Sequence, residues 1–214
     1  MIDAMIPASG ASMRLWQAAE PLVLASRSES RRALLAGAAI PVEVLPADID
    51  ERAIEARAGS KPPDEIAILL ARAKARAVAR KLPGRLVLGA DQTLALGERL
   101  FAKPADMAAA RAQLMSLRGE THELHSALVL ARDEAVLLEH CEIARLTMRN
   151  FSDRFLDSYM EAAGPAVTAS VGGYQVERAG IQLFERIEGD HFTILGLPLL
   201  RLLQYLRSEG WLAD

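Results

Sequence analysis

The alternation of apolar and polar positions along the chain predicts a mixture of helices and strands. Stretches with an apolar residue every three to four positions predict helices at 29–36, 62–82, 104–117, 152–163 and 197–209. Short apolar or alternating runs predict strands at 22–25, 41–46, 85–90, 93–96, 122–131 and 136–148. An acidic turn is expected at 48–52. With no repeat and no low-complexity linker, this order is typical of an α/β fold in which helices flank a mixed sheet.

Length and composition favour a single globular domain. Of the 214 residues, 51% are hydrophobic, which is enough for a substantial core, and the apolar runs are too short to span a bilayer. Residues 1–21 lack the basic start and the compact apolar block of a secretory signal. We expect them to be a poorly ordered leader, or to include a start codon upstream of a true start near Met13. We expect one domain over 22–210 and a short tail over 211–214.

Charge and cysteine content restrict the classes of partner and compartment. The formal net charge is −3, so the chain lacks the overall positive field of a protein that binds DNA or RNA. A phosphate-bearing ligand would therefore need a local cluster of cations. Cys141 is the only cysteine, which excludes an internal disulfide and fits a reducing compartment, so we expect a cytoplasmic protein. The thiol lies in a predicted strand and is expected to be buried and structural.

A serine-rich turn joins the first predicted strand to the first predicted helix. The N-terminus of a helix attracts anions through its free backbone N–H groups. Ser26 adds a hydroxyl there, and Arg31 and Arg32 add guanidinium groups that match phosphate oxygens. The alternative is a helix that is merely capped by Ser28 and carries two solvated arginines. The segment is not a phosphate-binding loop of the Gly-Lys-Ser type.

Asp91 follows the apolar strand predicted at 85–90, and ligands of α/β sheets bind at such strand ends. A carboxylate in this place needs a partner such as a metal ion, a cation or water. Asp50-Glu51 offers a second carboxylate for one ion, and Lys74 and Lys103 are candidate cations. Taken singly, these residues are also explained as a turn aspartate, a solvated acidic turn, a lysine that extends to solvent and a surface lysine before a helix.

Six motifs together resemble those of the Maf-like nucleotide pyrophosphatases. They are LASRSESRRALL at 24–35, Asp50-Glu51, LARAK at 70–74, GADQ at 89–92, Lys103-Pro104 and LFERIEGDHFTILGLPL at 183–199. The resemblance covers nearly the whole chain from Leu22 to Gly210, and the motifs are specific in combination although each one alone is weak. It implies an α/β fold with a deep central groove, related to the inosine triphosphatases, and a house-cleaning enzyme that removes non-standard nucleotides.

The resemblance implies a role for each matching residue. Asp91 corresponds to the proton acceptor and, with Glu51, to the contacts of a divalent Mg or Mn ion. The positions that bind substrate phosphates correspond to Ser26, Arg31, Arg32, Lys74 and Lys103. Such an enzyme hydrolyses a nucleoside triphosphate to a monophosphate and pyrophosphate, with the cations neutralising the phosphates and Asp91 activating water. Attack at the α-phosphorus is implied by the family and not by the spacing.

Three residues bear on which nucleotide is bound. Gln92 and Glu177 resemble the branch of the family that hydrolyses 7-methyl-GTP, whereas Ser30 departs from that branch, which carries a tryptophan there. A serine cannot stack on a purine. The alternatives are a dTTP/UTP pyrophosphatase of the same family and a nucleotide-binding regulator of septum formation. We expect a nucleoside triphosphate as partner, no nucleic-acid polymer and no membrane, and the aromatic residues Phe151 and Trp211 leave a homodimer open.

Overall fold

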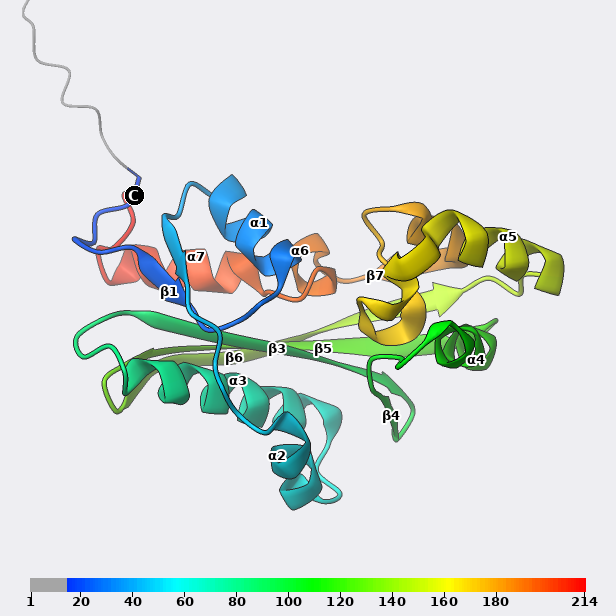
Figure 1. Cartoon of the computed structure of the whole chain (residues 1–214). Helices are drawn as coiled ribbons and strands as arrows, with labels where there is room; N and C mark the ends of the chain where they lie inside the picture. The colour runs from blue at the N-terminus through cyan, green and yellow to red at the C-terminus, as the bar shows by residue number, and fades with distance from the viewer. Residues whose placement is uncertain (1–14) are drawn as a thin grey trace, which may run out of the picture.

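Residues 15–214, which the computed structural model describes, form a seven-stranded mixed sheet with helices on both faces (Figure 1). The strands are β1 (Leu22–Leu24), β2 (Val42–Val44), β3 (Val87–Leu96), β4 (Arg99–Phe101), β5 (Thr121–Arg132), β6 (Ala135–Met148) and β7 (Phe184–Glu188). Their order is β2-β1-β3-β5-β6-β7, and β4 pairs with β3. The first three strands of this order are parallel and the others antiparallel. The predicted α/β class, a mixed sheet flanked by helices, is confirmed.

Helices cover the two faces of the sheet unequally. The helices are α1 (Glu29–Gly37), α2 (Glu51–Ala58), α3 (Pro63–Ala79), α4 (Met107–Leu117), α5 (Asp153–Ala163), α6 (His191–Ile194) and α7 (Leu199–Ser208), and the short 3-10 turns are η1 (Gly164–Thr168), η2 (Val171–Gly173) and η3 (Ala179–Leu183). Figure 1 shows α3 and α2 on one face and α1, α6 and α7 on the other. The chain between β2 and α2 crosses from the second face to the first.

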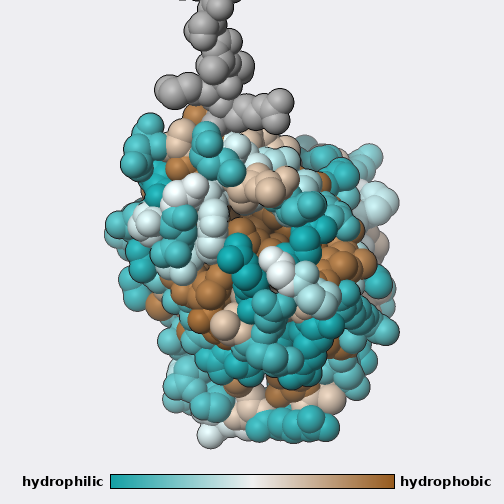
Figure 2. All heavy atoms as spheres, turned by 90° about the vertical axis from the view of Figure 1, so that its left-hand side faces the viewer, coloured by the Kyte–Doolittle hydropathy of each residue, from teal (hydrophilic) through white to brown (hydrophobic). Residues whose placement is uncertain are grey.

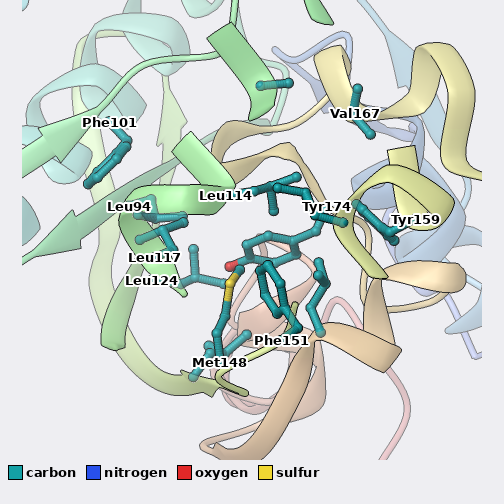
Figure 3. Packing of buried hydrophobic residues seen from close by; sticks show 14 of the residues in the cluster. Leu94, Phe101, Leu114, Leu117, Leu124, Met148, Phe151, Tyr159, Val167 and Tyr174 are labelled. Atoms are coloured by element: carbon teal, nitrogen blue, oxygen red, sulfur yellow. The ribbon is translucent and has the colours of Figure 1, made fainter. Parts of the chain in front are cut away.

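Three apolar clusters hold these layers together. Small side chains such as Ala71 and Ala75 let α3 approach the sheet closely. On the opposite face, a leucine-rich cluster that includes Leu24 packs the sheet against α1 and α7. The third cluster, around Leu114 and Tyr174, joins α4 and α5 to the part of the sheet where β3 pairs with β4 (Figure 3).

Asp91 lies in the middle of β3, so the prediction that it stands at a strand end is wrong. The strand is continuous because β5 pairs with it along 87–95 without interruption. On the other side of β3, β1 pairs only at Val87 and Leu88, and β4 pairs only from Leu94 onwards. No strand within residues 15–214 therefore pairs with 89–93 on that side. Asp91 is at the centre of this open edge.

The predicted acidic turn at 48–52 leads directly into helix α2, which the sequence analysis did not predict. The Asp50 side chain accepts a hydrogen bond from Ala53 N at 3.0 Å and caps the helix. Glu51 is thus the first residue of α2. Its position is set by a helix and by the chain that crosses from β2, and not by a loose turn.

The N-terminal end of the described chain pairs with its C-terminal end. Trp16 forms a β-bridge with Leu212, Gln17 N donates to Trp211 O, and Ala213 N donates to Leu15 O. Of the expected leader over 1–21, residues 1–14 lie outside the described residues. Figure 2 shows this end of the molecule, where hydrophilic residues cover most of the surface. Among the helices of residues 15–214, none has the length and apolarity that crossing a membrane requires.

Candidate active site

Lys74, Asp91 and Glu51 form an ion-paired cluster on the α3 face of the sheet. Lys74 Nζ lies 2.5 Å from Asp91 Oδ1 and 3.0 Å from Glu51 Oε1. Asp91 and Lys74 are buried, whereas half of the Glu51 side chain is exposed. The lysine does not extend to solvent, so the structure favours its alternative as a candidate cation of the site. Glu51, on α2, is the most exposed member of the cluster.

Close packing of α3 on β3 brings Lys74 to Asp91. A Cβ atom at Gly89 would lie 2.1 Å from Ala71 O and 2.6 Å from Ala75 N, so a side chain at this position would push the helix away from the strand. Lys74 belongs to the same turn of α3. Asp91 follows Gly89 by two residues and therefore faces the same side of the sheet. The glycine thus sets the distance between the paired charges.

Arg31 reaches the open edge of β3 from α1. Its Nη1 donates to Ser26 Oγ at 3.0 Å and to Ala90 O at 2.8 Å, and its Nε donates to Gly196 O at 2.8 Å. A guanidinium has five N–H groups, so those of Nη2 are left without a partner among residues 15–214. They are the ones available to a ligand.

The charge of Arg31 is linked to the acidic cluster. Burial lowers the pKa of Arg31, while the charges of Asp91 and Glu51 raise it. These carboxylates therefore help to keep a buried guanidinium charged. The arginine comes from the α1 face and Lys74 from the α3 face, so two cations approach the open edge from opposite sides of the sheet.

Burial raises the pKa of Asp91 above that of an ordinary aspartate, although the charges of Lys74 and Arg31 and the hydrogen bond from Lys74 act in the opposite direction. The Glu51 carboxylate adds to the increase. The pKa of Glu55, one turn further along α2, is also raised, first by burial and then by Asp91 and Glu51. Glu55 was missed by the sequence analysis, because the helix that places it one turn from Glu51 was not predicted.

The carboxylates of Glu51 and Asp91 fit a divalent ion that is held mainly by substrate phosphates. Both lie next to Lys74 Nζ and so face a common point. Within residues 15–214, no group of three or more His, Cys, Asp or Glu side chains is arranged to hold a metal ion. Mg²⁺ is commonly bound by one or two carboxylates together with waters and phosphates. The donor set agrees with that mode and not with an all-protein site.

Gln92 points to the opposite side of the sheet from Asp91. Its Nε2 donates to Ser126 Oγ at 2.8 Å and to the backbone carbonyls of Thr193 and Ile194 at 3.2 and 3.1 Å. These carbonyls belong to the last two residues of α6, and the connection from α6 to α7 supplies the Gly196 carbonyl that is bound by Arg31. The side chain of Gln92 is therefore anchored by the C-terminal part of the chain.

The other predicted site residues are more exposed. Arg32 is exposed, and its Nη2 pairs with Glu29 Oε2 at 2.5 Å. Ser30 is half-buried, and Lys103 and Glu177 are exposed. In the part of the chain that the structure describes, no side-chain hydrogen bond or ion pair involves these three residues. Their roles stay predictions.

The comparison with protein families agrees with this arrangement of residues. A family model described as Maf-like protein matches residues 21–209. The chain belongs to the Maf-like protein family. The match includes every candidate site residue named above, from Ser26 to Glu177.

Several relatives of known name are similar over their whole length. A protein from Rhodopseudomonas palustris (strain BisB18) named nucleoside triphosphate pyrophosphatase is 55% identical over 201 residues, which is 94% of this chain and 100% of that protein. One of the same name from Bradyrhizobium diazoefficiens is 56% identical with the same coverage. A protein from Mesorhizobium japonicum named 7-methyl-GTP pyrophosphatase is 52% identical over 89% of this chain and 97% of its own length.

Proposed function

We propose that the protein hydrolyses a nucleoside triphosphate to a nucleoside monophosphate and pyrophosphate. The observation that carries this proposal is the pair of Lys74 and Asp91 beside Arg31 at the open edge of β3. The arrangement combines a buried carboxylate, which can activate a water molecule, with two cations, which can neutralise the negative charge of the phosphates. The names of the relatives from Rhodopseudomonas and Bradyrhizobium support the same activity.

In this reaction Asp91 orients a water molecule and accepts its proton. The water oxygen forms a bond to the α-phosphorus, the bond from that phosphorus to the bridging oxygen breaks, and pyrophosphate leaves. The raised pKa makes the Asp91 carboxylate a better base than an exposed aspartate. Lys74 Nζ and Arg31 Nη2 neutralise the phosphate charge that would otherwise oppose attack. Ser26, Arg32 and Lys103 bind the rest of the triphosphate.

Glu51 and Asp91 would hold a divalent Mg or Mn ion at this site. When bound, such an ion supplies positive charge to the phosphate oxygens. The half-exposed carboxylate of Glu51 is accessible to an ion that arrives with the nucleotide. Lys74 pairs with both carboxylates and offsets part of their charge in the protein alone.

We propose 7-methyl-GTP as the candidate substrate within this class. Gln92 and Glu177 support it, as does the name of the relative from Mesorhizobium. Because Ser30 cannot stack on the base, we expect the base to be bound more weakly than it would be by a tryptophan. A preference for dTTP or UTP is the alternative.

A panel of triphosphates with Mg²⁺ or Mn²⁺ and identification of the products tests the proposal. We expect pyrophosphate release, with 7-methyl-GTP turned over faster than dTTP and UTP. The Asp91→Asn variant should lose at least about 100-fold in kcat. Asp157→Asn is the matched control, because it removes an exposed carboxylate that pairs with Arg111.

Three results of this experiment would contradict the proposed reaction, and a fourth would contradict only the proposed substrate. Turnover of no nucleotide, or equal turnover by the Asp91 variant, excludes the hydrolytic function and leaves a nucleotide-binding regulator. Stepwise release of inorganic phosphate would identify a phosphatase instead. A faster reaction with dTTP or UTP would overturn only the substrate assignment.

A further inference from the structure

Backbone carbonyls of residues 193–196, which we call the α6–α7 turn, hold two residues of the site. Those of Thr193 and Ile194 accept hydrogen bonds from Gln92 Nε2, and that of Gly196 accepts from Arg31 Nε. The turn is itself fixed, because Thr193 is fully buried and its N–H donates to the carboxylate of Asp190 at 3.0 Å. One short segment therefore determines the positions of an amide and a guanidinium.

Ser126 determines which way the Gln92 amide points. Ser126 is fully buried, and its hydroxyl donates to Thr193 O at 2.7 Å. A hydroxyl has a single hydrogen, so Ser126 Oγ must act as the acceptor in its 2.8 Å contact with Gln92 Nε2. The two carbonyls can only accept as well. All three partners thus require the nitrogen of the amide, and its oxygen is turned away from them.

The amide oxygen of Gln92 is left free to accept a hydrogen bond. Within residues 15–214 this atom has no hydrogen-bond partner. The side-chain amide of Gln92 and the guanidinium of Arg31 both lie near Gly196. The point that a Cβ atom of Gly196 would occupy lies 3.7 Å from Gln92 Cδ and 3.5 Å from Arg31 Nη2. Gln92 and Arg31 therefore both border Gly196, so the amide and the guanidinium nitrogen that is available to the nucleotide lie on the same side of the sheet.

We infer that Ser126 is a positioning residue, which fixes Gln92 so that its amide oxygen accepts a hydrogen bond from an N–H group of the bound nucleotide. The inference rests on the proposed function. Rotation of the amide would set its oxygen against two carbonyl oxygens, so the site favours nucleotides that present an N–H or NH₂ donor there and disfavours those that present an oxygen. The amino group of a guanine base is a donor of this kind.

A double-mutant cycle between Ser126 and Gln92 tests the inference. The readout is the ratio of kcat/KM values for triphosphates that differ only in the base, such as GTP and ITP, together with 7-methyl-GTP. We expect Ser126→Ala to reduce this ratio about fivefold through KM. In the Gln92→Ala background the same substitution should change nothing further, because the residue acts through the amide. Ser126→Thr retains the hydroxyl and should retain the ratio.

The control is Thr93→Val. Thr93 is also buried and its hydroxyl donates to a backbone carbonyl, that of Pro63, but on the α3 face. This variant should leave the ratio unchanged even if it melts at a lower temperature. Should Ser126→Ala fail to fold, Gln92→Glu replaces the test, because a carboxylate cannot donate to the two carbonyls and should lose the discrimination.

The inference is overturned if Ser126→Ala keeps the wild-type ratio or reduces it equally in both backgrounds. Failure of the proposed function is a separate outcome. If the wild type releases pyrophosphate from no nucleotide, the dissociation constants of the same nucleotides are measured by calorimetry in the four proteins of the cycle. The same coupling between Ser126 and Gln92 is expected in these constants, and its absence would overturn the inference.

Discussion

The ammonium group of Lys74 lies 2.5 Å from the carboxylate of Asp91, and both side chains are buried. Each is the nearest counter-charge of the other, since Glu51 is further from the lysine, at 3.0 Å. A buried charge that loses its partner is costly, whereas a pair that is replaced as a whole is not. The pair is therefore a structural unit as well as a candidate catalytic one.

The Lys74→Met variant should lower the free energy of unfolding by about 3 kcal/mol, because Asp91 is left buried without its partner. Adding Asp91→Asn should restore most of this loss, although both proteins should turn over nucleotide far more slowly than the wild type. Urea unfolding at neutral pH measures both effects. A double variant as unstable as Lys74→Met would show that the lysine contributes through packing and not through charge.

The pH dependence of turnover should reflect the raised pKa of Asp91. The base must be ionised, so kcat/KM should fall as the pH drops through this raised pKa, at a higher pH than an aspartate with the ordinary value of 3.8 would cause. Because the charge of Lys74 lowers the pKa of Asp91, residual activity of Lys74→Met should decline at a higher pH still. An acid limb that the lysine variant leaves in place would exclude Asp91 as the titrating group.

The two adjacent arginines should behave differently. Arg31→Lys cannot reproduce three hydrogen bonds to Ser26, Ala90 and Gly196, so kcat/KM should fall about 100-fold and the melting temperature should fall. Arg32→Ala should raise KM and change the stability by less than about 0.5 kcal/mol, because this side chain is exposed. Thermal melts and steady-state kinetics compare the two. If Arg31→Lys and Arg32→Ala lost the same amount of stability, the result would contradict the burial of Arg31 and the exposure of Arg32.

Gly89→Ala should be strongly destabilising, by about 3 kcal/mol or more, because the new Cβ would overlap with Ala71 O. The displaced helix would also carry Lys74 away from Asp91 and reduce turnover. Gly37→Ala is the control, since a Cβ there has no atom within 4 Å and the residue ends helix α1, where alanine should be slightly stabilising. Urea midpoints rank the variants, and similar midpoints would refute the close packing of α3 on β3.

His122 should make the fold less stable in acid. It is fully buried beside Tyr174, with its Nε2 2.6 Å from the hydroxyl, and burial lowers its pKa to about 4. The unfolded chain binds a proton near the ordinary value of 6.5 and the folded one only near 4. The free energy of unfolding should therefore fall by up to about 3 kcal/mol as the pH drops across this window.

Replacing His122 with glutamine should flatten that pH dependence, which unfolding curves at several pH values would measure. His191→Gln is the control, because His191 is exposed at the start of α6. If the slopes of wild type and His122→Gln coincide, the acid sensitivity arises from other groups.

Elements with local signals were predictable from the sequence. Helix α5 was placed at 152–163, and Ser152 caps it by accepting from Phe155 N. The two long strands β5 and β6 have regular alternation and were also recovered. The position of Asp91 was not, because Gly89-Ala90-Asp91-Gln92 resembles a turn locally and becomes a strand only by pairing with the distant strand β5. Tertiary pairing overrode local propensity there.

The candidate site shows the same division. Residue types and motif spacing indicated Ser26, Arg31, Lys74, Glu51 and Asp91, and the structure brings these five together. The contribution of the α6–α7 turn was not predictable, because its contacts are made by backbone carbonyls, which leave no signal in residue identity. The elements β7 and α6, within 183–199, were not predicted because they are too short to show a periodic pattern.

A stretch of strand without a neighbour usually attracts another chain and so promotes aggregation. Around Asp91 the edge of β3 that no strand pairs with instead faces the gap between β1 and β4, where we expect the nucleotide to take the place that a further strand would fill. Occupancy should then be visible in the backbone itself: the amides of 89–93 should exchange with deuterium more slowly when nucleotide is bound. The backbone amides at this opening would thus be best protected from exchange while nucleotide is bound.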